Sequence, residues 1–184
     1  MQRSRYALVA YTSDPVAEFI RQLRRELHPD LPLLPAHLTV VPPRVLPGEE
    51  APAVAAAAEI CTHIEPFEVN LGEVETFIPV TPTVFIRVAH AYQVSQLHDQ
   101  LTAQQALATA EEWPYLPHVT IVKMGTEEQA QTAYRLARRR WTQFECSRCI
   151  HVTELTFVRE VDQNHWVDVA GFPLGTTPVP HHED

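Results

Sequence analysis

Glycine is scarce in this chain, with five residues in 184. Loops that cradle phosphate groups with backbone N–H groups depend on closely spaced glycines. The chain contains no GxGxxG, GxxxxGK[ST] or GxSxG sequence. The sequence therefore argues against a dinucleotide-binding loop, a P-loop and a nucleophile elbow. An HExxH zinc-hydrolase helix is also absent from the sequence.

Cysteine is also rare, and the three residues are an odd number that fits reduced thiols better than a disulfide framework. Cys146 and Cys149 form a C-x-x-C. A zinc site of that kind needs a second pair of ligands and a turn between the sulfurs. We expect a strand over 146–158, where positions three apart point to opposite faces. Plain thiols are favoured over zinc or a redox pair, and no metal or cofactor is expected.

Basic residues are outnumbered: 14 Lys and Arg stand against 23 Asp and Glu, which gives a formal net charge of −9. Binding along long nucleic acid rests on many Lys or Arg contacts to phosphate, so we do not expect it. A small nucleotide or one RNA end, held by a few local cations, remains compatible with this charge. No stretch approaches the roughly 20 apolar residues of a transmembrane helix. The N-terminal segment is too polar for a signal peptide, and a cytoplasmic protein without membrane contact is expected.

One four-residue pattern occurs twice, as His37–Val40 (HLTV) and as His118–Ile121 (HVTI), each shortly after a Leu-Pro step. In a strand, positions i and i+2 lie on the same face. The His and the Thr of each motif should therefore project together, while the apolar residues between them enter the core. His-x-Thr alone is a weak signal. A third copy, His151–Thr153, lacks the Leu-Pro step and continues with Glu154, so we interpret it as an ordinary strand position.

Hydrophobic spacing predicts an alternating order of strands and helices. We expect helices over 16–28, 48–64, 93–107 and 127–143, and strands over 6–12, 67–77, 84–89, 149–158 and 165–169, with one more strand at each motif. Asp14 should cap the first helix with Pro15 at its first position, and Thr126 with Gln129 forms a capping box before the fourth. The order β-α-β-α-β followed by β-α-β-α-β-β indicates an internal duplication in an α+β protein with antiparallel sheets.

These features resemble the 2H phosphoesterase superfamily, and in particular its 2′-5′ RNA ligase-like branch of cyclic phosphodiesterases. The likeness rests on the two motifs, on the segment 67–77 followed by 84–88, and on Trp166 in the last strand. It implies one bilobal, duplicated α+β domain over residues 1–174. In that fold two antiparallel sheets surround a central cleft and helices pack on the outside. The Pro-rich, polar residues 175–184 are expected to form a flexible tail.

The resemblance also implies metal-independent hydrolysis of 2′,3′-cyclic phosphate or 2′-5′ phosphodiester bonds in small nucleotides or RNA ends. The reverse reaction, 2′-5′ ligation, is left open. Imidazole titrates near neutrality, so one histidine can act as base while the other acts as acid. We assign His118 as the base and His37 as the acid. The Thr39 and Thr120 hydroxyls would donate hydrogen bonds to the phosphate oxygens.

Three further residues are expected to bind substrate. Tyr115 lies three residues before the second motif and could stack on a base, while Arg44 and Lys123 follow the motifs and could neutralise phosphate. After the first motif, residues 41–44 (VPPR) replace the Phe-Leu-Gly of several RNA-acting relatives, which argues against long RNA. The alternatives are a non-catalytic nucleotide-binding or sensor module, and a metal hydrolase that a chelator would inactivate. A monomer is expected.

Overall fold

The computed structural model describes residues 4–29 and 34–175. In chain order its elements are β1 (Arg5–Tyr11), α1 (Val16–Leu27), β2 (His37–Val45), α2 (Glu50–Thr62), β3 (Phe67–Thr76), β4 (Thr83–Val88), α3 (Tyr92–Thr102), β5 (His118–Lys123), α4 (Glu127–Thr142), β6 (Cys149–Val152), β7 (Glu154–Asp162) and β8 (His165–Pro173). The tail expected over 175–184 lies outside the described residues except for Gly175.

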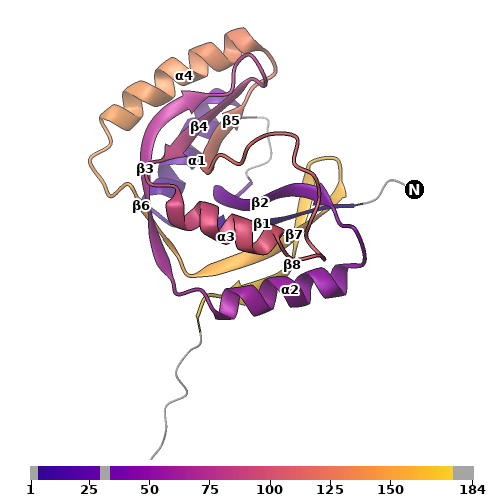
Figure 1. Ribbon diagram of the computed structural model, residues 1–184. Coiled ribbons are helices and arrows are strands. Elements are labelled where there is room, and N and C mark those ends of the chain that lie inside the picture. The colour runs from indigo at the N-terminus through magenta and orange to yellow at the C-terminus, as the bar shows by residue number, and fades with distance from the viewer. Residues whose placement is uncertain (1–3, 30–33, 176–184) are drawn as a thin grey trace, which may run out of the picture.

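The strands form one curled antiparallel sheet in the order β6-β3-β4-β5-β2-β1-β7-β8 (Figure 1). The α+β class with antiparallel pairing is thereby confirmed. The family resemblance predicts two sheets. They are continuous here, because the motif strands β2 and β5 pair with each other at Leu38 and Val119 in the middle of the order. Four strands lie on each side of this central seam.

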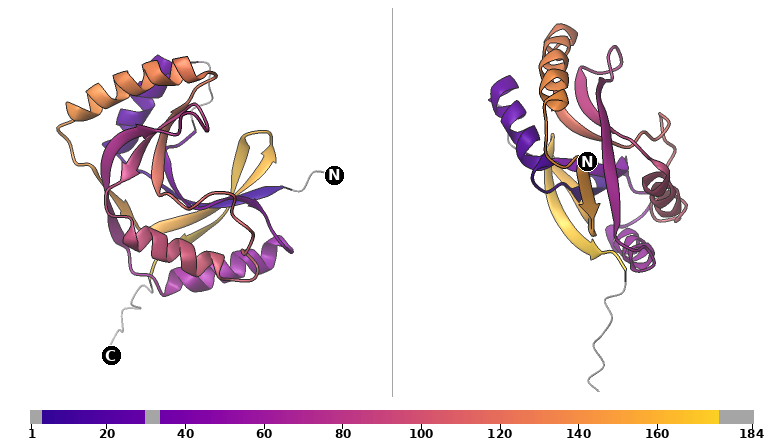
Figure 2. Two further views of the ribbon diagram at one scale, coloured as in Figure 1. Left: turned by 45° about the horizontal axis from the view of Figure 1, so that its top comes forward. Right: turned by 90° about the vertical axis from the view of Figure 1, so that its left-hand side faces the viewer.

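Two helices pack against the half of the sheet to which their preceding strand does not belong. The helix α1 follows β1 in sequence but lies against β5, whereas α3 follows β4 and lies against β2. The helix α4 packs on β3 and β4, and α2 packs on β8 (Figure 2). Each motif strand is therefore backed by a helix that comes from the other half of the chain.

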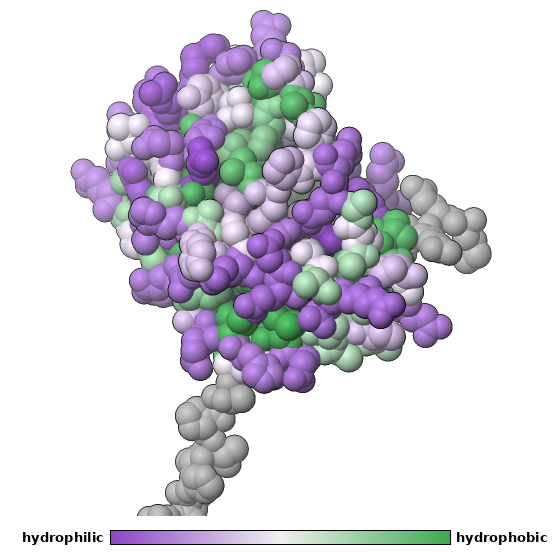
Figure 3. Space-filling model, in the orientation of Figure 1, coloured by the Kyte–Doolittle hydropathy of each residue, from purple (hydrophilic) through white to green (hydrophobic). Residues whose placement is uncertain are grey.

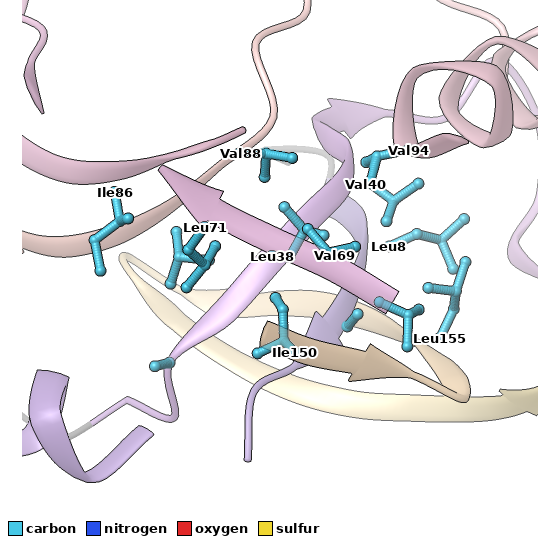
Figure 4. Packing of buried hydrophobic residues seen from close by; sticks show 14 of the residues in the cluster. Leu8, Leu38, Val40, Val69, Leu71, Ile86, Val88, Val94, Ile150 and Leu155 are labelled. Carbon is cyan, nitrogen blue, oxygen red and sulfur yellow. The ribbon is translucent and has the colours of Figure 1, made fainter. Parts of the chain in front are cut away.

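One hydrophobic core lies between these helices and the sheet. Alternate residues of β1 and β2, among them Leu8, Leu38 and Val40, enter it together with Val94 of α3 (Figure 4). The period of two that places these residues in the core leaves the intervening residues on the opposite side. We call that side of β2 and β5, which carries the His and Thr of both motifs, the open face.

Most expected elements are present, with three corrections. The helix expected over 93–107 ends at Thr102. The strand expected over 149–158 is two strands: β6 pairs with β3 and β7 pairs with β1, so the chain passes from one half of the sheet to the other at Thr153. Asp14 does not cap α1, which begins after Pro15 without a side-chain cap. Its carboxylate instead lies 3.2 Å from Arg21.

The Thr126 cap of α4 is confirmed, since its hydroxyl accepts a hydrogen bond from the backbone N–H of Gln129. The other half of the capping box differs, because the Gln129 side chain accepts from the Gly125 N–H rather than that of Thr126.

The described part of the chain contains no helix that is both long and apolar enough to cross a membrane. The face of the molecule seen in Figure 3 carries hydrophilic residues over most of its area, with smaller hydrophobic clusters between them.

Candidate active site

The two motifs meet at the centre of the sheet. The antiparallel pair of Leu38 with Val119 fixes the register, and one step along each strand in opposite directions gives the neighbouring positions. Residues opposite one another in a sheet share a face. Each histidine is therefore opposite the threonine of the other motif: His37 faces Thr120 and His118 faces Thr39. All four side chains are half-buried.

Both histidines are held in the same way. The Nδ1 atom of His37 lies 2.9 Å from the backbone oxygen of Pro35, and that of His118 lies 2.7 Å from the backbone oxygen of Leu116. A carbonyl oxygen can only accept, so Nδ1 carries the hydrogen in each ring. This leaves Nε2 as the nitrogen that takes up or releases a proton in both imidazoles.

Burial lowers the pKa of both imidazoles below the ordinary value, because removal from water disfavours the charged ring. The carbonyl partners of Nδ1 raise each pKa in part. The positive charge of Arg24 lowers the pKa of His37 further, and the charge of His37 does the same to His118. The register accounts for this effect, because it puts both rings on the same face of two adjacent strands.

In the second motif, the Arg24 side chain of α1 holds two backbone carbonyls. Its Nε lies 2.6 Å from the oxygen of Ile121 and its Nη2 lies 2.9 Å from that of Thr120. A third donor reaches the carbonyl of Leu34, just before the first motif. Among the described residues β2 and β5 share one register pair, so donors from outside the seam complete the bonding of these carbonyls.

The first motif is supported in an equivalent way. The Tyr115 hydroxyl donates to the Thr39 oxygen at 2.8 Å, and His98 Nδ1 donates to the Val40 oxygen at 2.7 Å. The Tyr115 and His98 rings stack, with centroids 3.8 Å apart and planes 6° from parallel. Tyr115 thus has a packing role in this structure, and its contact with a substrate base remains a prediction.

The two cations expected to bind phosphate have different surroundings. Arg44 is buried, pairs with Glu111 at 2.6 Å and donates to the carbonyls of Pro42 and Leu107. Its charge is balanced within the protein, and its contact with a substrate phosphate stays a prediction. Lys123 is exposed at the end of β5.

Sequence reasoning missed Arg87 of β4, which lies directly opposite His118. Its side chain is exposed and its Nη1 lies 3.4 Å from a carboxylate oxygen of Glu75. Arg87 therefore places a positive charge on the open face, directly beside the histidine of the second motif. Only the strand register reveals this, because Arg87 lies in a separate strand 31 positions from His118.

Aromatic side chains flank both histidines. The Phe77 and Phe85 rings lie 5.0 and 5.1 Å from His118, in edge-on geometry. On the other side, Tyr11 is opposite His37, and its hydroxyl donates to Asp168 at 2.5 Å. Phe85 is buried, whereas Phe77 and Tyr11 are partly exposed and give the open face apolar surface next to the polar motif groups.

The curled antiparallel sheet and the paired His-x-Thr strands define a 2H phosphoesterase. The model of the 2′-5′ RNA ligase superfamily matches residues 12–164, and the chain belongs to this family. The expectation drawn from the motifs is therefore confirmed at the level of the family.

Among its relatives is a phosphoesterase candidate of Halalkalibacterium halodurans, 25% identical over 92% of this chain and 97% of that protein. One from Oceanobacillus iheyensis is 25% identical over 93% and 98%. The fold is similar to that of E. coli LigT in complex with NADP+ (TM-score 0.66, 16% identity, 95% of this chain, 100% of that one). It is equally similar to TT0787 of Thermus thermophilus (TM-score 0.66, 16% identity, 94% and 100%).

Proposed function

We propose that this protein is a metal-independent phosphodiesterase that hydrolyses 2′,3′-cyclic phosphate or 2′-5′ phosphodiester bonds of small nucleotides or RNA ends. One observation carries the proposal. The register of β2 and β5 gathers two imidazoles and two hydroxyls on one face, and both imidazoles present Nε2 as the free nitrogen.

The reaction is an in-line displacement at phosphorus. One neutral imidazole takes a proton from the attacking water, and the protonated imidazole gives a proton to the leaving ribose oxygen. The P–O bond to that oxygen breaks as the new P–O bond forms, and a phosphomonoester results for a cyclic substrate. Thr39 and Thr120 donate hydrogen bonds to the non-bridging oxygens. Arg87 and Lys123 are the candidate cations for the phosphate charge.

The substrate class is supported by the size and charge of what related folds bind. E. coli LigT has been crystallised with 3′-AMP and with ATP as well as with NADP+. The aromatic rings beside both histidines offer apolar surface for a base or a ribose. A net charge of −9 is compatible with a small anionic ligand held locally.

The test is hydrolysis of nucleoside 2′,3′-cyclic monophosphates and a 2′-5′ dinucleotide in EDTA, with products identified by phosphorus NMR. Turnover is expected in EDTA. His37→Ala and His118→Ala should each lower kcat by about 10²–10⁴-fold, as loss of a positioned acid or base does. Both variants should fold, because the side chains lie on the open face. His63→Ala, at an exposed position in α2's C-cap, is the control.

A substrate with a nitrophenolate leaving group separates the two roles. Such a group needs no proton, so the variant that lacks the acid should recover activity and the variant that lacks the base should not. The sequence assignment predicts that His37→Ala recovers. Near-normal turnover in either alanine variant would refute the paired-histidine mechanism. Nucleotide binding without turnover would favour the sensor module, and loss of activity in EDTA would favour a metal hydrolase.

A further inference from the structure

Three metal-binding side chains meet far from the motifs, on the first part of β3 and on the edge strand β6. Glu68 and His151 are directly opposite in the β3–β6 pairing, and Cys149 precedes His151 by two positions on the same strand. All three side chains therefore share one face of the ladder. A carboxylate oxygen, a thiol sulfur and a ring nitrogen, one from each, lie within 4.8 Å of one another.

The backbone beneath this cluster is held firmly. The residues next to the three donors along the strands, Val69, Ile150 and Val152, are buried on the opposite face. Figure 4 shows Val69 and Ile150 among the packed core residues. The donors therefore project from strands whose relative position is already fixed, and binding an ion would cost mainly the freedom of three side chains.

The donors already interact before any ion binds. The His151 Nδ1 lies 3.2 Å from the Glu68 carboxylate, and both side chains are well exposed. Exposed pairs of this kind are worth little to stability, so exchanging the contact for metal ligation carries a small penalty. Their exposure also leaves room for a water molecule in the fourth position of a tetrahedral ion.

We propose that Glu68, Cys149 and His151 form a binding site for a divalent transition metal ion of the zinc class. One sulfur, one nitrogen and one oxygen suit zinc or cobalt(II). They do not suit magnesium or calcium, which take oxygen ligands. The site is not the C-x-x-C considered from the sequence, because Cys146 lies in the segment before β6 and is not one of the three donors.

This site is separate from the proposed active site. The strands β3 and β4 lie between β6 and the motif strand β5. With neighbouring strands about 4.8 Å apart, the offset across the sheet is roughly 14 Å. The bound ion would cross-link β6 to β3 and so secure one edge of the sheet, without contact with the histidines of the motifs.

The test is titration of the metal-free, reduced, full-length protein with cobalt(II), followed by absorption spectroscopy, and then displacement by zinc. His181 and His182 are replaced by alanine in every protein compared, so that this pair cannot bind the ion. One equivalent of cobalt should give a thiolate-to-cobalt charge-transfer band. Cys149→Ser should abolish the band, and His151→Ala and Glu68→Gln should each weaken binding at least about tenfold.

The matched control is Cys146→Ser, which removes an exposed thiol three residues away and should leave the band intact. Zinc should also raise the melting temperature of the parent protein and not that of Cys149→Ser. The proposal would be wrong if the parent gave no thiolate band. It would also be wrong if the band survived in Cys149→Ser, and its loss in Cys146→Ser would assign the thiolate to the other cysteine. None of these measurements uses catalysis, so the outcome is independent of the proposed phosphodiesterase activity.

Discussion

At the scale of single residues, the two histidines have the same tautomer and can still perform opposite tasks. Each Nδ1 donates to a carbonyl two residues earlier, so both rings present Nε2 to the open face. A neutral Nε2 accepts a proton and a protonated Nε2 donates one. In the proposed mechanism, the roles therefore depend on which ring carries the additional proton, and this determines how the rate varies with pH.

The pH dependence of kcat/KM should be a bell with its maximum below about pH 6.5, the ordinary pKa of histidine. The base must be neutral, so the rate rises with pH through its pKa, and the acid must be protonated, so the rate falls above its pKa. Burial lowers both pKa values in the free protein, which moves both limbs to lower pH. An anionic substrate favours the charged rings, so the profile of kcat should lie at higher pH. Rates from pH 4.5 to 9 test this, and a kcat/KM optimum above pH 8 would contradict it.

The sequence predicts the paired motif residues because a strand repeats every two positions, and this local rule holds in both copies. Arg87 and Arg24 could not be found in that way. The first depends on the register between β4 and β5, and the second on the packing of α1 behind β5. The sequence position of Arg44 also gave no sign of its surroundings, since its distance from the motif suggests a phosphate contact while its side chain is buried against Glu111.

At the scale of secondary-structure elements, each motif strand is supported by side chains from the opposite half of the chain. Arg24 of α1 donates to the carbonyls at the third and fourth positions of the second motif. His98 of α3 and the stacked Tyr115 make the same two contacts with the first motif. The two arrangements use different residues to satisfy equivalent backbone atoms, so the motif strands are supported alike by side chains that differ in type.

This arrangement predicts that Tyr115→Phe destabilises the protein by about 1–3 kcal/mol, because the variant leaves a carbonyl without its donor. It should also lower kcat while KM changes little, since the Thr39 backbone loses a support and the ring itself is retained. Chemical denaturation and steady-state kinetics measure the two effects. Tyr92→Phe is the control, because its side chain is 73% exposed. Unchanged stability with a raised KM would instead point to a direct contact of the hydroxyl with substrate.

The elements themselves were predictable where their cause is local. The Thr126 cap and the apolar period of α4 are properties of neighbouring residues, and this helix begins at the expected position. The division of 149–158 at Thr153 has no comparable local signal. Both parts read as strand, and they separate because one pairs with β3 and the other with β1. The pairing partners lie far away in the sequence, so periodicity alone predicts one strand where the structure has two, β6 and β7.

At the scale of the whole molecule, the sheet is continuous through a narrow seam where β2 pairs with β5. The histidines and threonines of both motifs lie at that seam, with a core behind it to which all four described helices contribute. The net charge of the molecule is negative, but exposed cations lie close to the motif groups. The formal net charge is −9, whereas Arg87 and Lys123 are exposed cations on the two strands β4 and β5 beside the motif groups. Under the proposed function, an anionic substrate would therefore be attracted locally and repelled at longer range.

This balance predicts that kcat/KM depends weakly on salt and on substrate length. The plot of log kcat/KM against log salt should have a slope on the order of −1, because one or two phosphate contacts release few counterions. A dinucleotide and an oligonucleotide of about ten residues, both ending in a 2′,3′-cyclic phosphate, should react with kcat/KM values that agree to within about threefold.

Arg87→Met should raise KM and make the slope shallower by roughly 0.7, the share of one contact to a single strand. Arg135→Met, on the exposed surface of α4, is the matched loss of charge and should change neither quantity. A slope near −4 together with tighter binding of the longer RNA would show an extended nucleic-acid surface, which the charge of this molecule argues against.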